Sequence, residues 1–258
     1  MKQLFSVILL LVTCYTFSQN TTIASGEKLK FSATYNMSGL LTELAEVTME
    51  TSSVKTSKTT LLRLKCTAAT YSQWDGFFKI RDLYESYVSP KYLTPYLYKR
   101  DINEGGYYKF MQYKFSHKKG SVSSLKKKRN SKGEIYKKEK TIPISKNVKD
   151  IVTTIYHLRN LSLDQAKVGD SQTFKVLFDN IEYSLTISMM GKETISTAIG
   201  SKECYKLGLS INNSDVLKGS TNLLWLTADK NKIPVYAKFK IAVGNGELKI
   251  KSATGLKY

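Results

Sequence analysis

The chain has 258 residues, of which 41% are hydrophobic and 11% aromatic, and its formal net charge at pH 7 is +19. This composition excludes a disordered polypeptide, because there is enough apolar material for a sizeable hydrophobic core. Beyond residue 19 no segment is apolar enough to cross a bilayer, which excludes a bundle of transmembrane helices.

Residues 1–19 have the three-part layout of a secretory signal peptide. Lys2 precedes an apolar run from Leu4 to Val12, and a short polar stretch then ends at Gln19. The run is well short of the ~20 apolar residues that span a bilayer. We therefore expect cleavage after Gln19, export across the inner membrane, and a periplasmic or outer-membrane-associated protein. The alternative is a lipoprotein, because residues 11–14 loosely resemble a lipoprotein box ending at Cys14.

Residues 20–258 are expected to form a single β-rich domain, because no flexible Pro/Gly/Ser linker interrupts them. The first strand signals are residues 26–35 and 60–70, where apolar and polar side chains alternate with the period of a half-buried strand. In the second of these segments Leu62, Leu64 and Cys66 fall on the apolar face.

The segment from Trp74 to Tyr108 interleaves aromatic residues with charges of both signs. Two strands joined through Pro90 and Pro95 would place Arg/Asp against Arg/Asp, as a ladder of ion pairs lined by tyrosines. Carboxylates beside aromatic rings also suit sugar binding. The candidate ligand-binding residues are Trp74, Arg81, Asp82, Tyr84, Glu85, Arg100, Asp101, Glu104 and Tyr107.

A lysine-rich stretch follows at residues 118–140, which carry nine lysines and Arg129 against Glu134 and Glu139. We interpret it as a long solvated hairpin whose lysines protect an exposed edge. In an exported protein the alternative is contact with lipid headgroups, lipopolysaccharide or acidic glycans, and no nucleic acid is expected. The candidate residues for an anionic surface are Lys126, Lys127, Lys128 and Arg129.

One segment, residues 148–161, has helical periodicity, with Asn147 or Ser145 as its expected cap. A single amphipathic helix among so many strands is expected to bury its apolar stripe against a strongly curved sheet.

The clearest hairpin lies between residues 173 and 189. A two-residue turn at Asp179-Asn180 pairs Phe178 with Ile181 and Val176 with Tyr183, which places the apolar side chains on one face. A further strand pair is predicted over 235–252. The predicted fold class is all-β and mainly antiparallel, a strongly curved sheet or barrel-like domain with one amphipathic helix near 148–161.

Strings along the chain resemble, in order and spacing, the exported domain-of-unknown-function family numbered 3108. The strings are residues 26–35, 76–87, 100–106, 150–161, 191–195 with 204–207, and 225–227 with 233–236. The resemblance covers essentially all of the chain after the signal peptide, and it implies the envelope of a Gram-negative bacterium, most like Bacteroidota. The family has no established activity, so it implies no catalytic residue.

The residues themselves show no catalytic or cofactor motif. His117 and His157 lack metal-ligand spacing, and there is no phosphate loop or nucleophile elbow, so we expect no metal, no cofactor and no catalytic residue. Cys66 and Cys204 are predicted to stay unpaired, because Cys204 shares a face with Lys206 whereas Cys66 lies on an apolar face.

Three hypotheses follow. The leading one is a non-enzymatic envelope protein that binds an apolar or amphiphilic ligand, lipid or lipopolysaccharide, in the curved sheet. The second is a glycan-binding or glycan-cleaving protein that uses the region from Trp74 to Glu104. The third is an assembly partner that docks to another envelope component through the basic hairpin. The oligomeric state is left open.

Overall fold

The structure is a computed structural model that describes residues 19–37, 40–211, 222–241 and 244–258. Cys14 and all but the last residue of the predicted signal peptide therefore lie outside the described residues. The strands are β1 (Lys28–Met37), β2 (Leu40–Lys55), β3 (Thr60–Thr70), β4 (Arg81–Val88), β5 (Pro95–Glu104), β6 (Tyr107–Ser116), β7 (Ser121–Arg129), β8 (Ile135–Pro143), β9 (Lys149–Asp150), β10 (Ser171–Phe178), β11 (Ile181–Thr197), β12 (Gly200–Ile211), β13 (Leu223–Thr227), β14 (Pro234–Ile241) and β15 (Gly244–Thr254). The helices are α1 (Ile151–Leu158) and two single 3₁₀ turns, η1 (Ser72–Trp74) and η2 (His117–Lys119).

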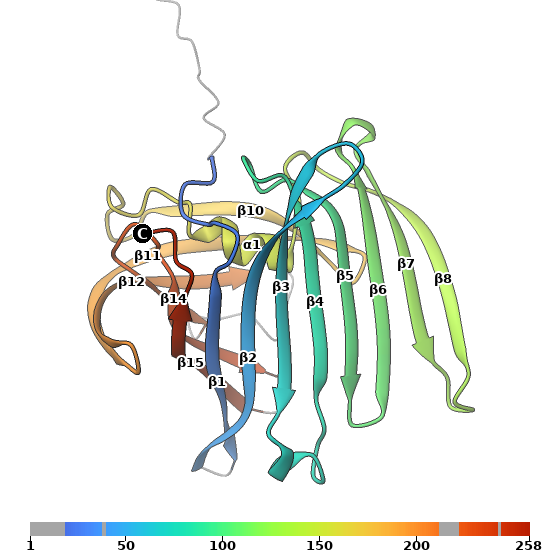
Figure 1. The fold of residues 1–258 in the computed structure, drawn as a ribbon, viewed down its shortest axis with the longest axis horizontal. Coiled ribbons are helices and arrows are strands. Elements are labelled where there is room, and N and C mark those ends of the chain that lie inside the picture. Colours follow the sequence, from blue (N-terminus) through green and yellow to red (C-terminus); the bar gives the residue numbers. More distant parts are fainter. Residues whose placement is uncertain (1–18, 38–39, 212–221, 242–243) are drawn as a thin grey trace, which may run out of the picture.

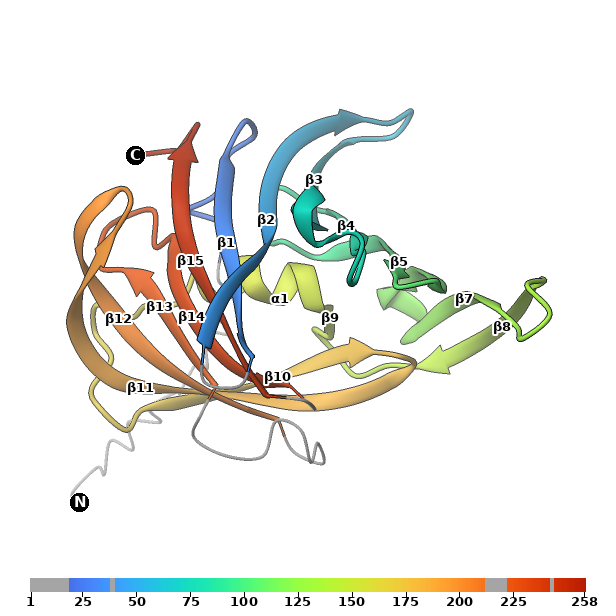
Figure 2. The same ribbon diagram turned by 90° about the horizontal axis from the view of Figure 1, so that it is seen from below.

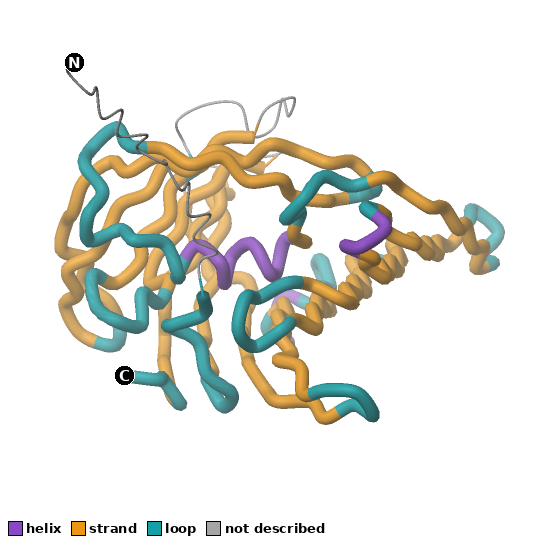
Figure 3. Tube along the Cα trace, turned by 90° about the horizontal axis from the view of Figure 1, so that it is seen from above, coloured by secondary structure: helices purple, strands orange, loops and turns teal. Residues whose placement is uncertain are grey.

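Within the described residues the strands form one 15-stranded sheet whose edges are β8 and β9. Strands β1 to β8 follow one another as antiparallel neighbours, as do β10 to β15, and the pairing of β1 with β15 joins the two series. Among the described strands only the short β9 pairs in parallel, with β10. Figure 1 shows β1–β8 as one broad arm and β10–β12 crossing behind it, and Figures 2 and 3 show the sheet curving around α1. The predicted fold class is confirmed.

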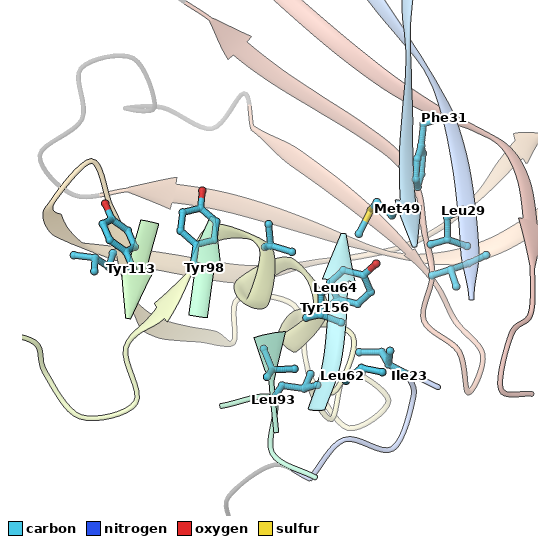
Figure 4. Close-up of a cluster of buried hydrophobic side chains, with 14 of the residues drawn as sticks. Ile23, Leu29, Phe31, Met49, Leu62, Leu64, Leu93, Tyr98, Tyr113 and Tyr156 are labelled. Carbon is cyan, nitrogen blue, oxygen red and sulfur yellow. The ribbon is translucent and has the colours of Figure 1, made fainter. Parts of the chain in front are cut away.

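The helix joins two hydrophobic clusters of the concave side. Val152 and Tyr156 belong to a cluster that spreads over β1–β7, and Leu158 belongs to a second cluster on β10–β13. Figure 4 shows Tyr156 beside Leu64 in the first cluster. Each large apolar side chain removed from water contributes roughly 1.5–3 kcal/mol. Burial of these side chains therefore stabilises the packing of the helix against the curved sheet.

The helix is shorter than predicted, and its predicted caps are wrong. Asp150 is the N-cap: its backbone is extended, and its Oδ1 accepts a hydrogen bond from the Thr153 amide at 2.8 Å. Asn147 instead has a left-handed backbone, with φ of +61°. Asp150 Oδ2 also accepts from Ser86 Oγ at 2.7 Å, so the cap ties the helix to β4. Burial raises the pKa of the Asp150 carboxyl.

The hairpin of β10 and β11 has the predicted turn and register. Phe178 pairs with Ile181, and Val176 pairs with Tyr183. Asp179 and Asn180 have φ of +49° and +71°, as a two-residue primed turn requires. The expected one-sided burial is incomplete, because Leu177 on the opposite face is fully buried in the cluster that contains Tyr156.

Candidate functional site

The candidate residues of β4 and β5 are divided between the two faces of the sheet. The two strands are antiparallel neighbours, as predicted, with Tyr84 opposite Arg100 and Leu83 opposite Asp101. Because side chains alternate along a strand, each pair shares one face. The face turned toward α1 carries Asp82, Tyr84, Arg100 and Glu104, whereas Arg81, Glu85 and Asp101 lie on the outer face.

The predicted ladder of ion pairs between β4 and β5 is wrong. Arg81 pairs with Asp75 at 2.5 Å, and Glu85 pairs with Arg63 of β3. Asp101 accepts a hydrogen bond from the side chain of Asn103 at 3.2 Å. Arg81, Glu85 and Asp101 thus each interact with a residue other than the one opposite on β4 or β5. The pairing of these two strands does not by itself predict those partners. An open sugar-binding cleft that uses both sets of residues is therefore not formed by this arrangement.

Arg100 and Lys109 of the concave face bind the turn between β10 and β11. Arg100 Nη2 donates to Asp179 Oδ1, and its guanidinium lies 4.4 Å from the centre of the Phe178 ring. Lys109 Nζ donates to both carboxylate oxygens of Asp179, at 2.5 and 2.6 Å. Burial lowers the pKa of Lys109. Burial by itself would raise the pKa of Asp179, but the hydrogen bond from Lys109 and the charge of Arg100 outweigh it and lower that pKa.

Asn180 completes the attachment of this turn. Its amide donates to the Tyr113 hydroxyl at 2.9 Å, and its Oδ1 accepts from Ser124 Oγ at 2.7 Å. We call Asp179 and Asn180, with their partners on β5–β7, the turn clasp. It links the two series of strands through side chains, since no strand pairing joins β10 or β11 to β5–β7 in the described sheet. Lys109, Tyr113, Ser124 and Asp179 were not among the sequence candidates.

Asp82 and Glu104 form a carboxyl pair beside the clasp. Burial and the neighbouring Glu104 raise the pKa of Asp82 to about 7, although the Asn103 amide donates to its Oδ1 at 3.0 Å. Two carboxyl groups at hydrogen-bond distance share a proton more readily than they both ionise. On the same face the Arg100 Nε atom is buried and has no hydrogen-bond partner among the described residues. This end of the concave face is therefore polar.

A groove of about 350 Å³ with a mixed apolar and polar lining lies on the concave side, beneath the loop that follows α1. Its apolar lining is Leu161, Leu163, Ala166, Ile187, Met189 and Leu207. Its polar lining is Ser162, Gln165, Asp170, Ser171 and Gln172. The Gly169 amide donates to the Met189 carbonyl at 2.9 Å, and the Met189 amide donates to the Asp170 carbonyl at 2.8 Å. These hydrogen bonds attach the loop to β11, and the attached loop forms one wall of the groove.

A second groove, of about 370 Å³, lies over β6–β8 and is lined by Gln112, Lys114, Ser123, Ser124, Leu125, Glu139, Lys140 and Thr141. Because polar side chains dominate its lining, the first groove is the better place for an apolar group. In the described part of the chain, no cluster of His, Cys, Asp and Glu is suited to hold a metal ion. Cys66 and Cys204 are free thiols.

The remaining sequence candidates lie toward one end of the arm formed by β1–β8. Trp74 donates from its indole nitrogen to the Glu43 carbonyl at 3.1 Å. Tyr107 is 46% exposed, with Lys128 Nζ 5.6 Å from its ring centre. Lys126 and Lys128 share the concave face with Met111 and Lys109, whereas Lys127 and Arg129 lie on the outer face, over the rings of Phe110 and Tyr108. The two lysine-rich strands β7 and β8 form the predicted hairpin.

These features define a class of protein: a strongly curved, open antiparallel sheet wrapped around one buried helix. A crystal structure of a β-barrel-like protein of the unknown-function family DUF1849, from Brucella abortus, has this fold, with a TM-score of 0.58 at 7% identity over 90% of this chain and 98% of that one. Weaker matches are a candidate exported protein from Bacteroides fragilis (TM-score 0.36, 9% identity, 90% and 96% coverage) and a candidate lipoprotein from Parabacteroides distasonis (0.35, 10%, 90% and 96%).

The model of the family "Protein of unknown function (DUF3108)" matches residues 30–251, and the chain belongs to that family. The resemblance seen in the sequence is thus confirmed. No curated protein matches the chain in sequence. Within the described residues there is no helix with the length and apolar character needed to cross a membrane.

Proposed function

We propose that this protein is an exported, non-enzymatic envelope protein that binds an amphiphilic molecule, with the ligand's apolar part in the groove beneath the loop after α1. The groove carries the proposal: its volume of about 350 Å³ lies at the lower end of the ~300–1,000 Å³ range of small-molecule sites. Aliphatic side chains of the core line it together with polar side chains from the loop and from β10. Such a lining suits a single acyl chain with a polar head.

The position of the groove supports the same function. Ile187, Met189 and Leu207 belong to the hydrophobic cluster that also holds Leu158 of α1, so the site is built on rigid strands. The covering loop is fastened at Gly169 and Asp170, and its Leu161 and Leu163 contribute buried side chains. A ligand in the groove would therefore be held between strands and a loop that are ordered before it binds, which lowers the entropic cost of binding.

The proposal is tested with a variant that fills the groove without removing a side chain of the hydrophobic core. In Ala166→Trp a large ring enters the groove from the loop, and we expect binding of a fluorescent fatty acid to weaken at least about tenfold, the effect of losing ~1.4 kcal/mol of contact. Val168→Trp is the matched control, because Val168 lies in the same loop and is 72% exposed. Native mass spectrometry of the wild-type protein purified from its own envelope identifies any lipid that stays bound.

Two results would overturn the proposal. One is wild-type protein that carries no lipid and shows no saturable binding of the fatty acid. The other is equal affinity in Ala166→Trp and Val168→Trp, with both variants folded as judged by circular dichroism.

A further inference from the structure

The loop between β3 and β4 exposes two adjacent aromatic rings at one end of the sheet. Phe77 is 74% exposed and Phe78 is 45% exposed. Figures 1 and 2 show that η1 and its loop lie at the same end of the arm as the β5–β6 and β7–β8 turns. We call residues 74–79 the aromatic tip. It is separate from the groove, which lies over β10–β12.

Hydrogen bonds and an ion pair hold the backbone of the tip in the conformation that exposes the two rings. The amides of Phe77 and Phe78 both donate to the Trp74 carbonyl, at 2.9 and 3.0 Å. Asp75 accepts from Thr70 Oγ1 at 2.6 Å and pairs with Arg81, which fixes the loop to the ends of β3 and β4. Several interactions thus hold an apolar surface in water, where it has an unfavourable hydration free energy.

A second brace comes from the neighbouring turn. The Gly105 amide donates to the Lys79 carbonyl at 2.9 Å. The Phe78 ring lies so close to Gly105 that a Cβ there would be 2.5 Å from the ring, and Gly105 has φ of +51°. A side chain at position 105 would displace the ring. Trp74 and Arg81, singled out in the sequence as ligand contacts, are therefore positioning residues for the tip.

Basic residues lie in the tip and on the neighbouring strands β6–β8. Lys79 belongs to the tip itself, and Lys128 lies over the ring of Tyr107 next to the Gly105 turn. At the adjoining β7–β8 turn, Ile135 and Tyr136 are exposed at 56% and 40% beside Arg129. The end of the arm thus combines protruding apolar and aromatic side chains with lysine and arginine.

We propose that this end of the protein docks on the surface of an anionic lipid bilayer, with Phe77 and Phe78 inserted at the level of the headgroups. Aromatic rings favour the membrane–water interface, and lysine and arginine next to them are attracted to anionic lipids. The excess of 40 basic over 21 acidic residues in the whole chain supplies the long-range attraction. A protruding tip flanked by long flexible cations suits a fluid surface, whereas a protein partner would need a matching concavity.

The experiment is cosedimentation of the full protein with vesicles of phosphatidylethanolamine and phosphatidylglycerol, compared with vesicles of phosphatidylcholine. We expect binding to the anionic vesicles that weakens with added salt. The double variant Phe77→Ser/Phe78→Ser should lose at least about tenfold in partition coefficient, because each inserted ring buries apolar area. Tyr96→Ser is the matched control: Tyr96 is 46% exposed, close to the 45% of Phe78, but it lies at the start of β5, at the opposite end of that strand from the Gly105 turn.

The charge contribution is tested by Lys128→Glu/Arg129→Glu, which should weaken binding to the anionic vesicles by about tenfold or more and make the remaining binding less dependent on salt. Wild-type protein that stays in the supernatant with anionic vesicles overturns the proposal, as does equal binding by the serine double variant and Tyr96→Ser. The proposal does not rest on ligand binding in the groove, and Ala166→Trp should bind vesicles like the wild type. A loss of vesicle binding in that variant would place the contact at the groove and contradict docking through the tip.

Discussion

Replacing Asp179 by Asn should weaken the turn clasp and lower the free energy of unfolding. The side chains of Arg100 and Lys109 are only 5% and 10% exposed, so both cations depend on Asp179 for charge balance. Leaving a fully buried charge without its partner costs about 3–5 kcal/mol. Since the Asp179 side chain is 34% exposed, water screens part of that cost, and we expect a loss of about 2 kcal/mol. Asn tolerates the left-handed backbone at this position, so the turn itself is not strained.

The assay is urea unfolding followed by tryptophan fluorescence. With a slope of about 3 kcal/mol/M, a loss of about 2 kcal/mol lowers the midpoint by roughly 0.7 M. Hydrogen exchange of the Asn180 amide, which donates to the Tyr113 hydroxyl, should accelerate by up to about thirtyfold. Asp101→Asn, on the outer face of β5, is the control and should cost under about 1 kcal/mol.

A double-mutant cycle then isolates the pair. Arg100→Met combined with Asp179→Asn should destabilise by less than the sum of the two single changes, because Asp179→Asn leaves the Arg100 guanidinium without its carboxylate and Arg100→Met then removes that unpaired charge. Equal midpoints for Asp179→Asn and Asp101→Asn, or strict additivity in the cycle, would refute the role assigned to the clasp.

The remaining predictions concern buried charge. Glu27→Gln should lower the free energy of unfolding by about 3–5 kcal/mol, because the Glu27 carboxylate accepts two hydrogen bonds of 2.6 Å from the fully buried Arg159. Urea unfolding measures this loss. A loss under about 1 kcal/mol contradicts the reasoning. The raised pKa of Asp82, about 7 in the folded protein against about 4 in an unfolded chain, means that the folded state binds the proton more tightly. The free energy of unfolding should therefore fall as pH rises from about 4 to about 7, and this fall should be absent in Asp82→Asn. Urea unfolding curves of both proteins at a series of pH values test the prediction. The same pH dependence in the wild type and the variant would show that Asp82 is not responsible. Asp150→Ala should destabilise the protein by at least about 1–2 kcal/mol through loss of the helix N-cap, measured against Asp164→Ala, an exposed acid of the following loop.

Local sequence patterns were sufficient to predict many of the strands and the register of one hairpin. Val176 and Tyr183 pair as predicted, because a two-residue turn at Asp179-Asn180 and the alternation of side chains along each strand allow few other registers. The presence of the helix followed from apolar spacing, but its first residue did not. Ser86 of β4 shares the Asp150 side chain with Thr153, and that contact spans 64 residues of sequence.

The site depended on contacts between distant segments. The alternation of β4 and β5 was readable, yet it did not reveal that Arg100 would pair with Asp179, which lies 79 residues away. Phe77 and Phe78 stood in the stretch that the sequence singled out, but exposure is a property of the folded loop, and aromatic residues in a β protein are more often buried.

The sequence by itself determined the family, the all-β class, the lysine-rich hairpin and the presence of one helix, because composition and short-range periodicity encode all four. The tertiary structure decided how the sheet curves around α1, which face each charged residue of β4 and β5 occupies, and where a groove remains beneath the loop after α1. These depend on contacts between segments far apart in the chain, whose free energies no local pattern contains.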